Sequence, residues 1–371
     1  QQQLRTFELA VQQVGVEMQM RGVKIDTAYA ATLGPHFDAL RDQGSETAAQ
    51  WGIDKVNSPA QVAAVLTALG VELLETTKSG APKVDKQVLA DIIGNADVNG
   101  PAAEVAEAVL QAKRAGKNKV TYVDNVLQSL DINDRVHPWI HTLQARTARM
   151  SISSPPLQQL PSGDYHVRRM FIPDEGHVMG ATDYAQIELR VLAVLADERK
   201  MVDAINGGND LHDVTAANLF GPSFTKQQRK LAKNVGFGRV YGGGATTLAR
   251  QAAVPLDDAK RAMSGYDNAF PGIKRFSKRL QDRAKHGVPE VVTPAGRVLP
   301  LDRWRLYSAT NYMVQSTARD VLANAMVELK AAGLGEHLLL PIHDEILFQA
   351  PADIADEVGR EIQRVMTVPF G

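Results

Sequence analysis

Two apolar segments that each run into an aspartate restrict the fold more than any other feature of this sequence. Residues 177–183 predict a buried strand that ends at Asp183, and residues 338–342 and 346–348 predict a hairpin with Asp344 in its turn. The two aspartates are 161 positions apart, yet strands so distant in sequence can be neighbours in one sheet. Because residues 186–334 between them have mainly helical patterns, the sequence predicts a mixed α+β fold.

The first third of the chain is predicted to be mostly helical. Ser58 caps a helix that starts at Pro59, and Gln61 can complete a capping box. The other elements expected here are a helix over 5–21, a strand over 23–25, a helix capped by Asp26 that reaches about residue 50, and helices over about 85–93 and 101–127. Together they predict a protruding helical lobe from about 55 to 130.

The net charge of the chain gives little indication of a nucleic-acid partner, whereas local clusters of basic residues do indicate one. The 371 residues have a net charge of −1. Attraction to phosphate falls off over about 10 Å at 0.1 M salt, so clusters matter more than the total. Lys113, Arg114, Lys117 and Lys119 form a run without an intervening acid, and a second basic group lies within 274–283. A solvated helix face is an equally ordinary interpretation of either run.

Several classes of protein are disfavoured by what the sequence lacks. It has no cysteine, which excludes disulfides and thiolate metal sites and fits a reducing compartment. It has no apolar run of about 18 residues and no pattern of a signal peptide. We therefore expect no membrane partner and no export.

Asp183 and Asp344 suit the binding of divalent metal ions. Magnesium prefers hard oxygen ligands and takes others from water and phosphates, so one or two protein carboxylates suffice. Two such ions can activate a hydroxyl and stabilise a leaving pyrophosphate. Taken singly, each aspartate is more simply explained as the cap of a turn or helix.

A basic and aromatic stripe lies between the two aspartates in sequence. Residues 225–228 predict a capping box, after which Arg229, Lys233, Phe237 and Tyr241 recur every four residues on one helix face. Such spacing often marks core packing, but two cations make that interpretation poor. Cations followed by aromatic rings could hold a triphosphate and then stack on a base.

These segments together resemble the family A DNA polymerases, of the bacterial DNA polymerase I type. The resemblance runs from residue 17 to residue 369. Its motifs are Asp183 to Arg190; Arg229, Lys233, Phe237, Tyr241 and Gly242; His343, Asp344 and Glu345; Thr147 to Ser151 with Leu157 to Gln159; and Asn311, Gln315, Thr317 and Ala318. It leaves open a bacterial or a phage source, and it implies the cytoplasm of a bacterial cell or of a phage-infected host.

The resemblance implies the right-hand polymerase fold, with an antiparallel palm sheet, a helical thumb and helical fingers. The expected boundaries are an N-terminal palm segment over 1–54, a thumb over 55–134, palm with the first aspartate over 135–203, fingers over 204–333, and palm with the second aspartate over 334–371.

The resemblance also implies roles in catalysis and nucleotide binding. Asp183, Asp344 and the backbone carbonyl of Tyr184 would hold two Mg²⁺ ions, for which Mn²⁺ can substitute, and Lys233 could protonate pyrophosphate. The expected nucleotide-binding residues are Arg229 and Lys233 at the triphosphate, Phe237 at the sugar and base, Tyr241 at the stacking position beside the template base, Glu188 against the 2′ position, and Gln186 and His212 near the triphosphate. Glu188 could otherwise be an ordinary surface glutamate, and His212 a structural histidine.

Residues expected to contact DNA lie in several segments. The family comparison places Arg149, Asn311, Gln315 and His343 along the minor groove at the primer end, where acceptors are nearly independent of sequence. Ordinary surface polarity is the competing interpretation, above all for Asn311. The remaining expected contacts are Glu345, Lys113, Lys117 and Lys119.

The predicted function is template-directed synthesis of DNA from deoxynucleotides on a primer-template, by a monomer without a proofreading exonuclease in this chain. A single-subunit RNA polymerase shares the aspartates and the lysine helix, but Glu188 and residues 147–159 argue against it. A catalytically idle DNA-binding module is the other alternative. The retention of both aspartates, Arg229 and Lys233 argues against that one.

Overall fold

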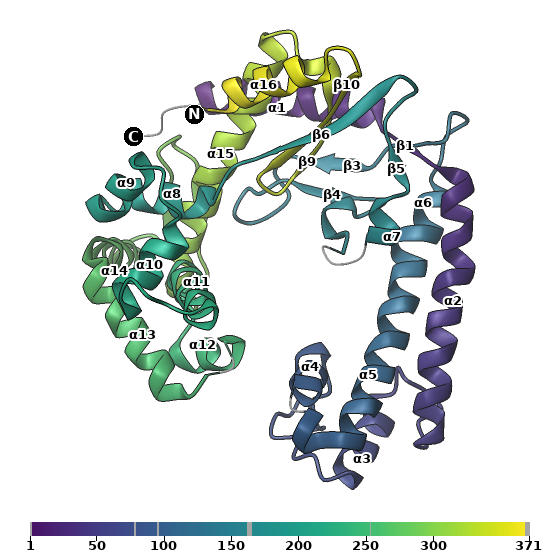
Figure 1. The fold of residues 1–371 in the computed structure, drawn as a ribbon. Helices are drawn as coiled ribbons and strands as arrows, with labels where there is room; N and C mark the ends of the chain where they lie inside the picture. Colours follow the sequence, from purple (N-terminus) through teal and green to yellow (C-terminus); the bar gives the residue numbers. More distant parts are fainter. Residues whose placement is uncertain (1, 78, 95, 162–164, 253, 368–371) are drawn as a thin grey trace. The chain divides into compact units, whose positions relative to one another are not determined.

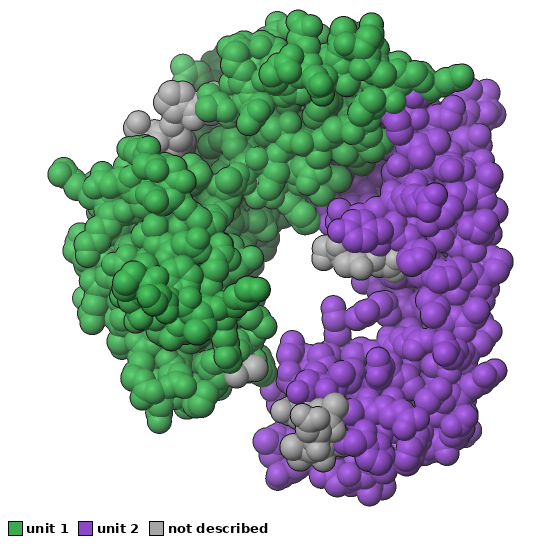
Figure 2. Space-filling view, in the orientation of Figure 1, with its two compact units in different colours: residues 1–21, 140–151, 175–371 green, residues 22–139, 152–174 purple. Residues whose placement is uncertain are grey.

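In the computed structural model, the structure describes residues 2–77, 79–94, 96–161, 165–252 and 254–367. They form two compact units (Figure 2). Unit 1 consists of residues 1–21, 140–151 and 175–371, and unit 2 consists of residues 22–139 and 152–174. The finer division into palm, thumb and fingers stays a prediction, and the last four residues of its final segment, 368–371, lie outside the described residues.

The central sheet of unit 1 joins the two predicted acidic strands. It has the order β6-β10-β9, and its strands are β6 (His177–Asp183), β9 (Leu338–Ile342) and β10 (Glu345–Pro351). β10 pairs antiparallel with both neighbours. The prediction that strands distant in sequence share one sheet is confirmed. The prediction that β6 is buried is wrong, because β6 is the edge strand of a small sheet and each of its residues keeps some exposure.

Three helices of unit 1 pack with this sheet (Figure 1): α1 (Gln2–Arg21), α15 (Ala309–Ala331) and α16 (Ala355–Met366). Met18, Leu322, Ile346 and Ile362 are buried in the core that they share. At Gly180 a Cβ atom would lie 2.4 Å from Phe348 Cζ, so only glycine lets that ring cross β6.

The remaining elements of unit 1 form a second, mainly helical core. Leu192, Val235, Tyr266 and Val314 are buried in it. Its helices are α8 (Ile187–Leu195), α9 (Arg199–Asn206), α10 (Leu211–Phe220), α11 (Lys226–Tyr241), α12 (Ala245–Ala252), α13 (Leu256–Ala269) and α14 (Pro271–His286), followed by the hairpin of β7 (Glu290–Val292) and β8 (Val298–Pro300). Short 3₁₀ turns, η3 (Leu306–Ser308) and η4 (Gly335–His337), flank α15. The helical prediction for residues 186–334 is therefore largely confirmed.

Unit 2 is built around two long helices, α2 (Thr27–Gln50) and α5 (Ala96–Asn118), which pack along each other (Figure 1). Leu66, Leu89 and Val105 are buried between them and the shorter helices. The other elements are β1 (Val23–Ile25), α3 (Pro59–Ala68), α4 (Lys86–Gly94), η1 (Lys119–Asp124), α6 (Asn125–Gln128), β2 (Arg135–Val136), η2 (Leu157–Gln159), α7 (Tyr165–Arg168) and β5 (Phe171–Ile172); β3 (Trp139–His141) and β4 (Ser151–Ser153) pair where the chain passes from one unit to the other.

The helix caps of unit 2 follow the sequence only in part. Asp26 accepts a hydrogen bond from the Tyr29 N–H, and Ser58 caps α3 as predicted. Gln61 does not complete a capping box, because its side chain accepts a hydrogen bond from the Lys55 N–H at 2.9 Å. No described helix of either unit is both long enough and apolar enough to cross a membrane.

Candidate active site

The two aspartates predicted to bind metal lie at the same end of the central sheet of unit 1. Asp183 is the last residue of β6 and lies opposite Glu345 of β10, and Asp344 is in the turn between β9 and β10. The Tyr184 N–H donates a hydrogen bond to the Asp344 carbonyl oxygen at 3.1 Å, which holds the chain after β6 against that turn. His343 has a left-handed backbone, with φ 58°. The hairpin thus brings three carboxylates together.

This crowding of carboxylates changes the proton affinity of Asp183. Partial burial and the charges of Asp344 and Glu345 raise the pKa of Asp183 to about 6. Such a carboxylate favours a proton or a bound cation. Among the described residues, no group of three His, Cys, Asp or Glu side chains is arranged to hold a metal. Mg²⁺ needs only one or two protein carboxylates, so the hard oxygens of Asp183 and Asp344 fit this ion.

We expect millimolar Mg²⁺ to raise the melting temperature of the protein at pH 8 but not at pH 5. The pKa of Asp183 is raised above its ordinary value. Ionisation of this carboxyl group, which lowers the stability of the folded state, is therefore complete only when the pH has risen through about 6. A cation that binds the ionised pair offsets that effect and stabilises the folded state by mass action. Thermal melts with and without Mg²⁺ measure it. An equal Mg²⁺ shift in Asp344→Asn would contradict the assignment.

The segment after β6 carries two further predicted residues, Tyr184 and Gln186. Burial raises the pKa of the Tyr184 phenol to about 12, and its hydroxyl has no hydrogen-bond partner among the described residues. Gln186 has φ 56° and precedes α8. Its side chain donates a hydrogen bond to Asp210 at 2.8 Å and accepts one from the Leu211 N–H at 3.2 Å. Gln186 therefore ties the start of α8 to the start of α10.

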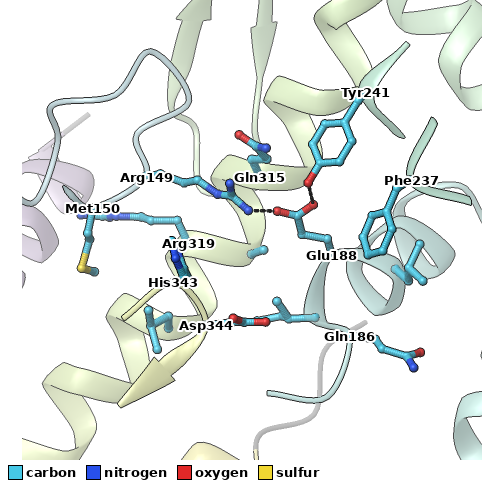
Figure 3. Close-up of a pocket in the computed structure, with 14 residues that line it drawn as sticks. Arg149, Met150, Gln186, Glu188, Phe237, Tyr241, Gln315, Arg319, His343 and Asp344 are labelled. Atoms are coloured by element: carbon cyan, nitrogen blue, oxygen red, sulfur yellow. Dashed lines mark hydrogen bonds and ion pairs between the residues drawn. The ribbon is translucent and has the colours of Figure 1, made fainter. Parts of the chain in front are cut away.

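A cavity of about 190 Å³ opens beside Asp344 (Figure 3). Its walls come from α8, α11, α15, the β9–β10 turn and residues 149–150. Eight of the predicted site residues line it: Arg149, Gln186, Glu188, Phe237, Tyr241, Gln315, His343 and Asp344. The structure therefore gathers these eight residues, from five separate segments, around one cavity, whereas the lining does not include Arg229, Lys233, His212 or Asn311, for which nucleotide or primer contacts were also predicted.

Glu188 is the best-anchored acid of this cavity. It is only 7% exposed, on the first turn of α8. One carboxylate oxygen is ion-paired with Arg149, and the other accepts a hydrogen bond from the Tyr241 hydroxyl at 2.8 Å (Figure 3). Burial and the Glu188 charge raise the pKa of Tyr241, so this phenol stays a donor at neutral pH. Glu188 is therefore a buried group of the site, and the alternative of a free surface glutamate is wrong.

The stripe on α11 is present as predicted, and the capping box of Thr225 and Gln228 starts the helix. Phe237 lies 6.1 Å from Tyr241 between ring centroids, in a stacked arrangement. Lys233 is exposed. The aromatic half of the stripe therefore lines the cavity, and its exposed lysine shows that the stripe is not part of a closed core.

Arg229 and His212 belong to a charged group where α10 and α11 meet. Arg229 is ion-paired with Asp213 and, at 3.1 Å, with Asp210. His212 is buried, and its ring centroid lies 5.6 Å from that of Phe237. Burial and the nearby cations lower the pKa of His212, so it is neutral at physiological pH.

The face of α15 toward the cavity carries Gln315 and, one turn earlier, Asn311. Gln315 is buried, and its side chain hydrogen-bonds with Tyr241. The Asn311 side-chain oxygen is buried and has no partner within the part of the chain that the structure describes. Its unused acceptor distinguishes it from an ordinary surface polar residue.

The predicted DNA-contacting lysines lie in unit 2, at and just after the end of α5. Burial lowers the pKa of Lys113. The Lys117 ammonium lies 6.0 Å from the ring centroid of Tyr122. Lys119 is ion-paired with Asp38 and Asp124, at 3.6 and 3.4 Å. The run has no acid within it in sequence, but the fold supplies acids for its last member.

A buried ionic network beside the cavity was missed by the sequence analysis. Arg319, which lines the cavity, is ion-paired with Glu8 at 2.7 Å and with Asp320 at 3.1 Å, and Arg297 pairs with the same two acids. The Arg319 side chain is 2% exposed. The sequence does contain one indication of this network, because residues 319 and 320 are charged within the otherwise uncharged stretch 313–326.

We expect Glu8→Gln to lower the free energy of unfolding by about 3 kcal/mol at pH 7, because it leaves buried guanidinium groups under-compensated. Burial alone would raise the pKa of Glu8, but hydrogen bonds from Arg319 and Arg297 outweigh it and lower that pKa below 4.5. The stabilisation by ionised Glu8 is therefore fully present above the ordinary pKa of a glutamate, and it is lost as the pH falls through the pKa of Glu8 in the folded protein. Urea unfolding at pH 7 and pH 3 measures it.

Glu17→Gln, on the same helix, is the matched control. Its partner is Lys330, and both side chains are partly exposed, so the change should cost less than about 1 kcal/mol. Equal losses for the two variants would contradict the special role of the buried network.

Comparison with known proteins gives consistent matches over nearly the whole chain. The family model described as DNA polymerase family A matches residues 28–370. A DNA polymerase of Mycobacterium phage D29 is 42% identical over 98% of this chain and 60% of its own length, and that of Mycobacterium phage L5 is 36% identical over 98% and 59%. The chain thus spans about three-fifths of the length of these relatives.

A solved structure matches as well. It is described as the POL domain of Pol1 from M. smegmatis in complex with DNA primer-template and dNTP. The TM-score is 0.86 at 28% identity, over 98% of this chain and 67% of that one. The predicted fold class is confirmed by this match and by the small antiparallel sheets of the structure.

Proposed function

The chain is a member of DNA polymerase family A, and from this premise we propose that it is a template-directed DNA polymerase that adds deoxynucleotides to a primer 3′ end and releases pyrophosphate. The observation that carries the proposal is the meeting of Asp183 and Asp344 beside the cavity that Glu188 and Tyr241 line. The similar POL domain was solved with primer-template and dNTP, which supports the same two partners here.

The chemistry would be in-line attack of the primer 3′-oxygen on the α-phosphate of the bound nucleotide. Asp183, Asp344 and the Tyr184 carbonyl would hold two Mg²⁺ ions, which when bound lower the pKa of the hydroxyl and stabilise the leaving pyrophosphate. Lys233, exposed on α11, can reach a phosphate and protonate the leaving group.

Arg229 and Phe237 would bind the nucleotide from the same helix as Lys233. Arg229 is held by Asp210 and Asp213, so a triphosphate must share or replace these partners. The neutral His212 and Gln186 lie beside this group and would complete the triphosphate end. Phe237 would pack against the sugar and base.

Glu188, Tyr241 and the minor-groove set would check the base pair and the sugar. A carboxylate packed beside the sugar leaves no space for a 2′-hydroxyl, which would select deoxynucleotides. Tyr241 would stack beside the template base. Asn311, with Gln315, Arg149 and His343, would contact the primer end, and the side-chain N–H groups of these residues would donate to the minor-groove acceptors.

The DNA duplex would also be contacted by Glu345 in unit 1 and by Lys113, Lys117 and Lys119 in unit 2. Contacts between lysine side chains and the phosphate backbone of DNA give affinity without sequence preference, and they weaken as the salt concentration rises. We propose that the protein acts as a monomer. Sedimentation tests this point.

The proposal is tested by extension of a labelled primer on a DNA template with Mg²⁺ and either deoxy- or ribonucleotides. We expect extension with deoxynucleotides and very little with ribonucleotides. Preference for ribonucleotides would favour a single-subunit RNA polymerase. Tight binding of primer-template with no extension by either set would favour an idle DNA-binding module.

Phe237 leads to a prediction about dideoxynucleotides. In this family, phenylalanine at that position accompanies discrimination against dideoxynucleotides, and tyrosine accompanies their acceptance. We expect the wild type to terminate poorly with them and Phe237→Tyr to terminate at least about tenfold more readily, a difference of about 1.4 kcal/mol. Competition between dideoxy- and deoxynucleotides in primer extension measures the ratio. Equal termination by the two proteins would contradict it.

A further inference from the structure

An exposed aromatic and basic patch of unit 1 is not used by the site described above. Trp304 is 92% exposed and Tyr307 is 42% exposed, in the loop that joins β8 to α15. Arg303 and Arg305 flank Trp304 and are exposed as well. Trp304 belongs to neither hydrophobic core of unit 1. A tryptophan between two exposed arginines has no role in the packing of this fold.

Hydrogen bonds hold the backbone turn of this loop and two of its side chains, Arg305 and Tyr307. The Arg305 N–H donates a hydrogen bond to the Asp302 carbonyl at 2.9 Å, and the Trp304 N–H donates to the Asp302 side chain at 3.0 Å, which together form a closed turn. The Arg305 guanidinium lies 5.8 Å from the Tyr307 ring centroid, and its Nε donates to the Tyr307 hydroxyl at 3.0 Å. A fixed turn lowers the ordering cost when a ligand binds.

A second arginine and aromatic pair lies at the base of the same loop. Arg146 donates a hydrogen bond to the carbonyl oxygen of Pro300, the last residue of β8, at 3.2 Å. Its guanidinium lies 5.7 Å from the ring centroid of Tyr312 on α15. Asp302 is the only acid within residues 300–312. The surface therefore combines positive charge with flat rings.

This surface adjoins the candidate active site through Tyr307. A Cβ atom on Gly242 would lie 2.6 Å from Tyr307 Cδ2, so Tyr307 packs directly on the residue that follows Tyr241 at the end of α11. Gly242 has φ 72°, which lets the chain turn away at this contact. The place proposed for the template base thus leads directly to the exposed loop.

We propose that Trp304, Tyr307, Arg303, Arg305 and Arg146 form a binding site for the single-stranded template beyond the base being copied. Unpaired bases expose their faces and stack on aromatic rings with little sequence preference, while arginines neutralise the backbone. In a paired duplex the base faces are covered by their neighbours, so duplex DNA fits this surface less well. A surface with several arginines and few acids also fits a nucleic acid better than a protein partner. The inference rests on the proposed function, because it needs a template strand at Tyr241.

The test compares two primer-template duplexes that are identical except for their 5′ template overhang, of one nucleotide or eight thymidines. Binding is followed by anisotropy of a dye on the distant blunt end. We expect the wild type to bind the long overhang about tenfold more tightly, because one stacked base contributes about 1–3 kcal/mol. Trp304→Ala should lose this gain. Trp139→Ala, which changes another exposed tryptophan, should keep it.

Salt provides a second measurement. The double variant Arg303→Ser and Arg305→Ser should lower the slope of log Kd against log salt for the long overhang by about 0.7 per arginine. Equal wild-type affinity for both duplexes, an equal loss on both in Trp304→Ala, or loss of the gain in Trp139→Ala would overturn the site. A changed oligomeric state of Trp304→Ala without an overhang effect would assign the patch to self-association instead.

Failure of this inference can be separated from failure of the proposed function. If the wild type extends both primers but shows no overhang dependence, only the template site is wrong. If the wild type extends neither primer, the polymerase proposal itself is contradicted.

Discussion

Asp344→Asn is expected to reduce nucleotide incorporation by at least about 10³-fold while primer-template binding is kept. Asparagine has the shape of aspartate but not its charge, so the variant removes a hard anionic ligand from the pair at the end of β6 and β10. A loss of about 4 kcal/mol of transition-state stabilisation corresponds to that factor. The hairpin itself should be unaffected, because its ladder uses only backbone groups.

Single-turnover extension of a bound primer measures this effect, since it separates chemistry from binding. Asp353→Asn is the matched control, because Asp353 is exposed just beyond the other end of β10. The control should keep wild-type rates. Rates within about tenfold of wild type for Asp344→Asn would remove this aspartate from the reaction.

Glu188→Ala is expected to lower discrimination against ribonucleotides by about 10²-fold. Truncation to alanine would open the space beside the sugar where a 2′-hydroxyl would lie. Discrimination between two substrates by the packing of a single group is typically about 10²-fold. The same change releases Tyr241 and Arg149 from their shared partner, so deoxynucleotide incorporation should slow as well.

Glu188→Gln separates the volume of this side chain from its charge. Glutamine fills the same space and can still accept a hydrogen bond from Tyr241, so ribonucleotides should remain excluded. The measurement is the ratio of kcat/KM for matched deoxy- and ribonucleotides in the wild type and both variants. An unchanged ratio in Glu188→Ala would show that another residue selects the sugar.

Local sequence patterns predicted the elements that place the site. The apolar patterns before Asp183 and around Asp344 predicted these strands, and the structure pairs them in one sheet. The four-residue stripe from Arg229 to Tyr241 lies on one helix that begins at the predicted capping box. Each of these features depends on residues close in sequence, with their side chains repeating at the period of a strand or helix.

Features that depend on distant partners were not predictable in this way. Glu8 and Arg319 are 311 positions apart, and nothing in either segment specifies that they pair. The exposure of β6 depends on how many strands join the sheet, which the strand itself does not encode. Trp304 lies in a turn, where no periodicity indicates whether a side chain is buried or exposed.

The most direct test of the account is single-nucleotide extension of a labelled primer, with each of the four deoxynucleotides offered in turn opposite each template base. If the cavity of unit 1 catalyses templated synthesis, the wild type will add only the complementary deoxynucleotide, in a Mg²⁺-dependent reaction that Asp344→Asn abolishes. Addition without regard to the template base, or no addition to a bound primer, would contradict it.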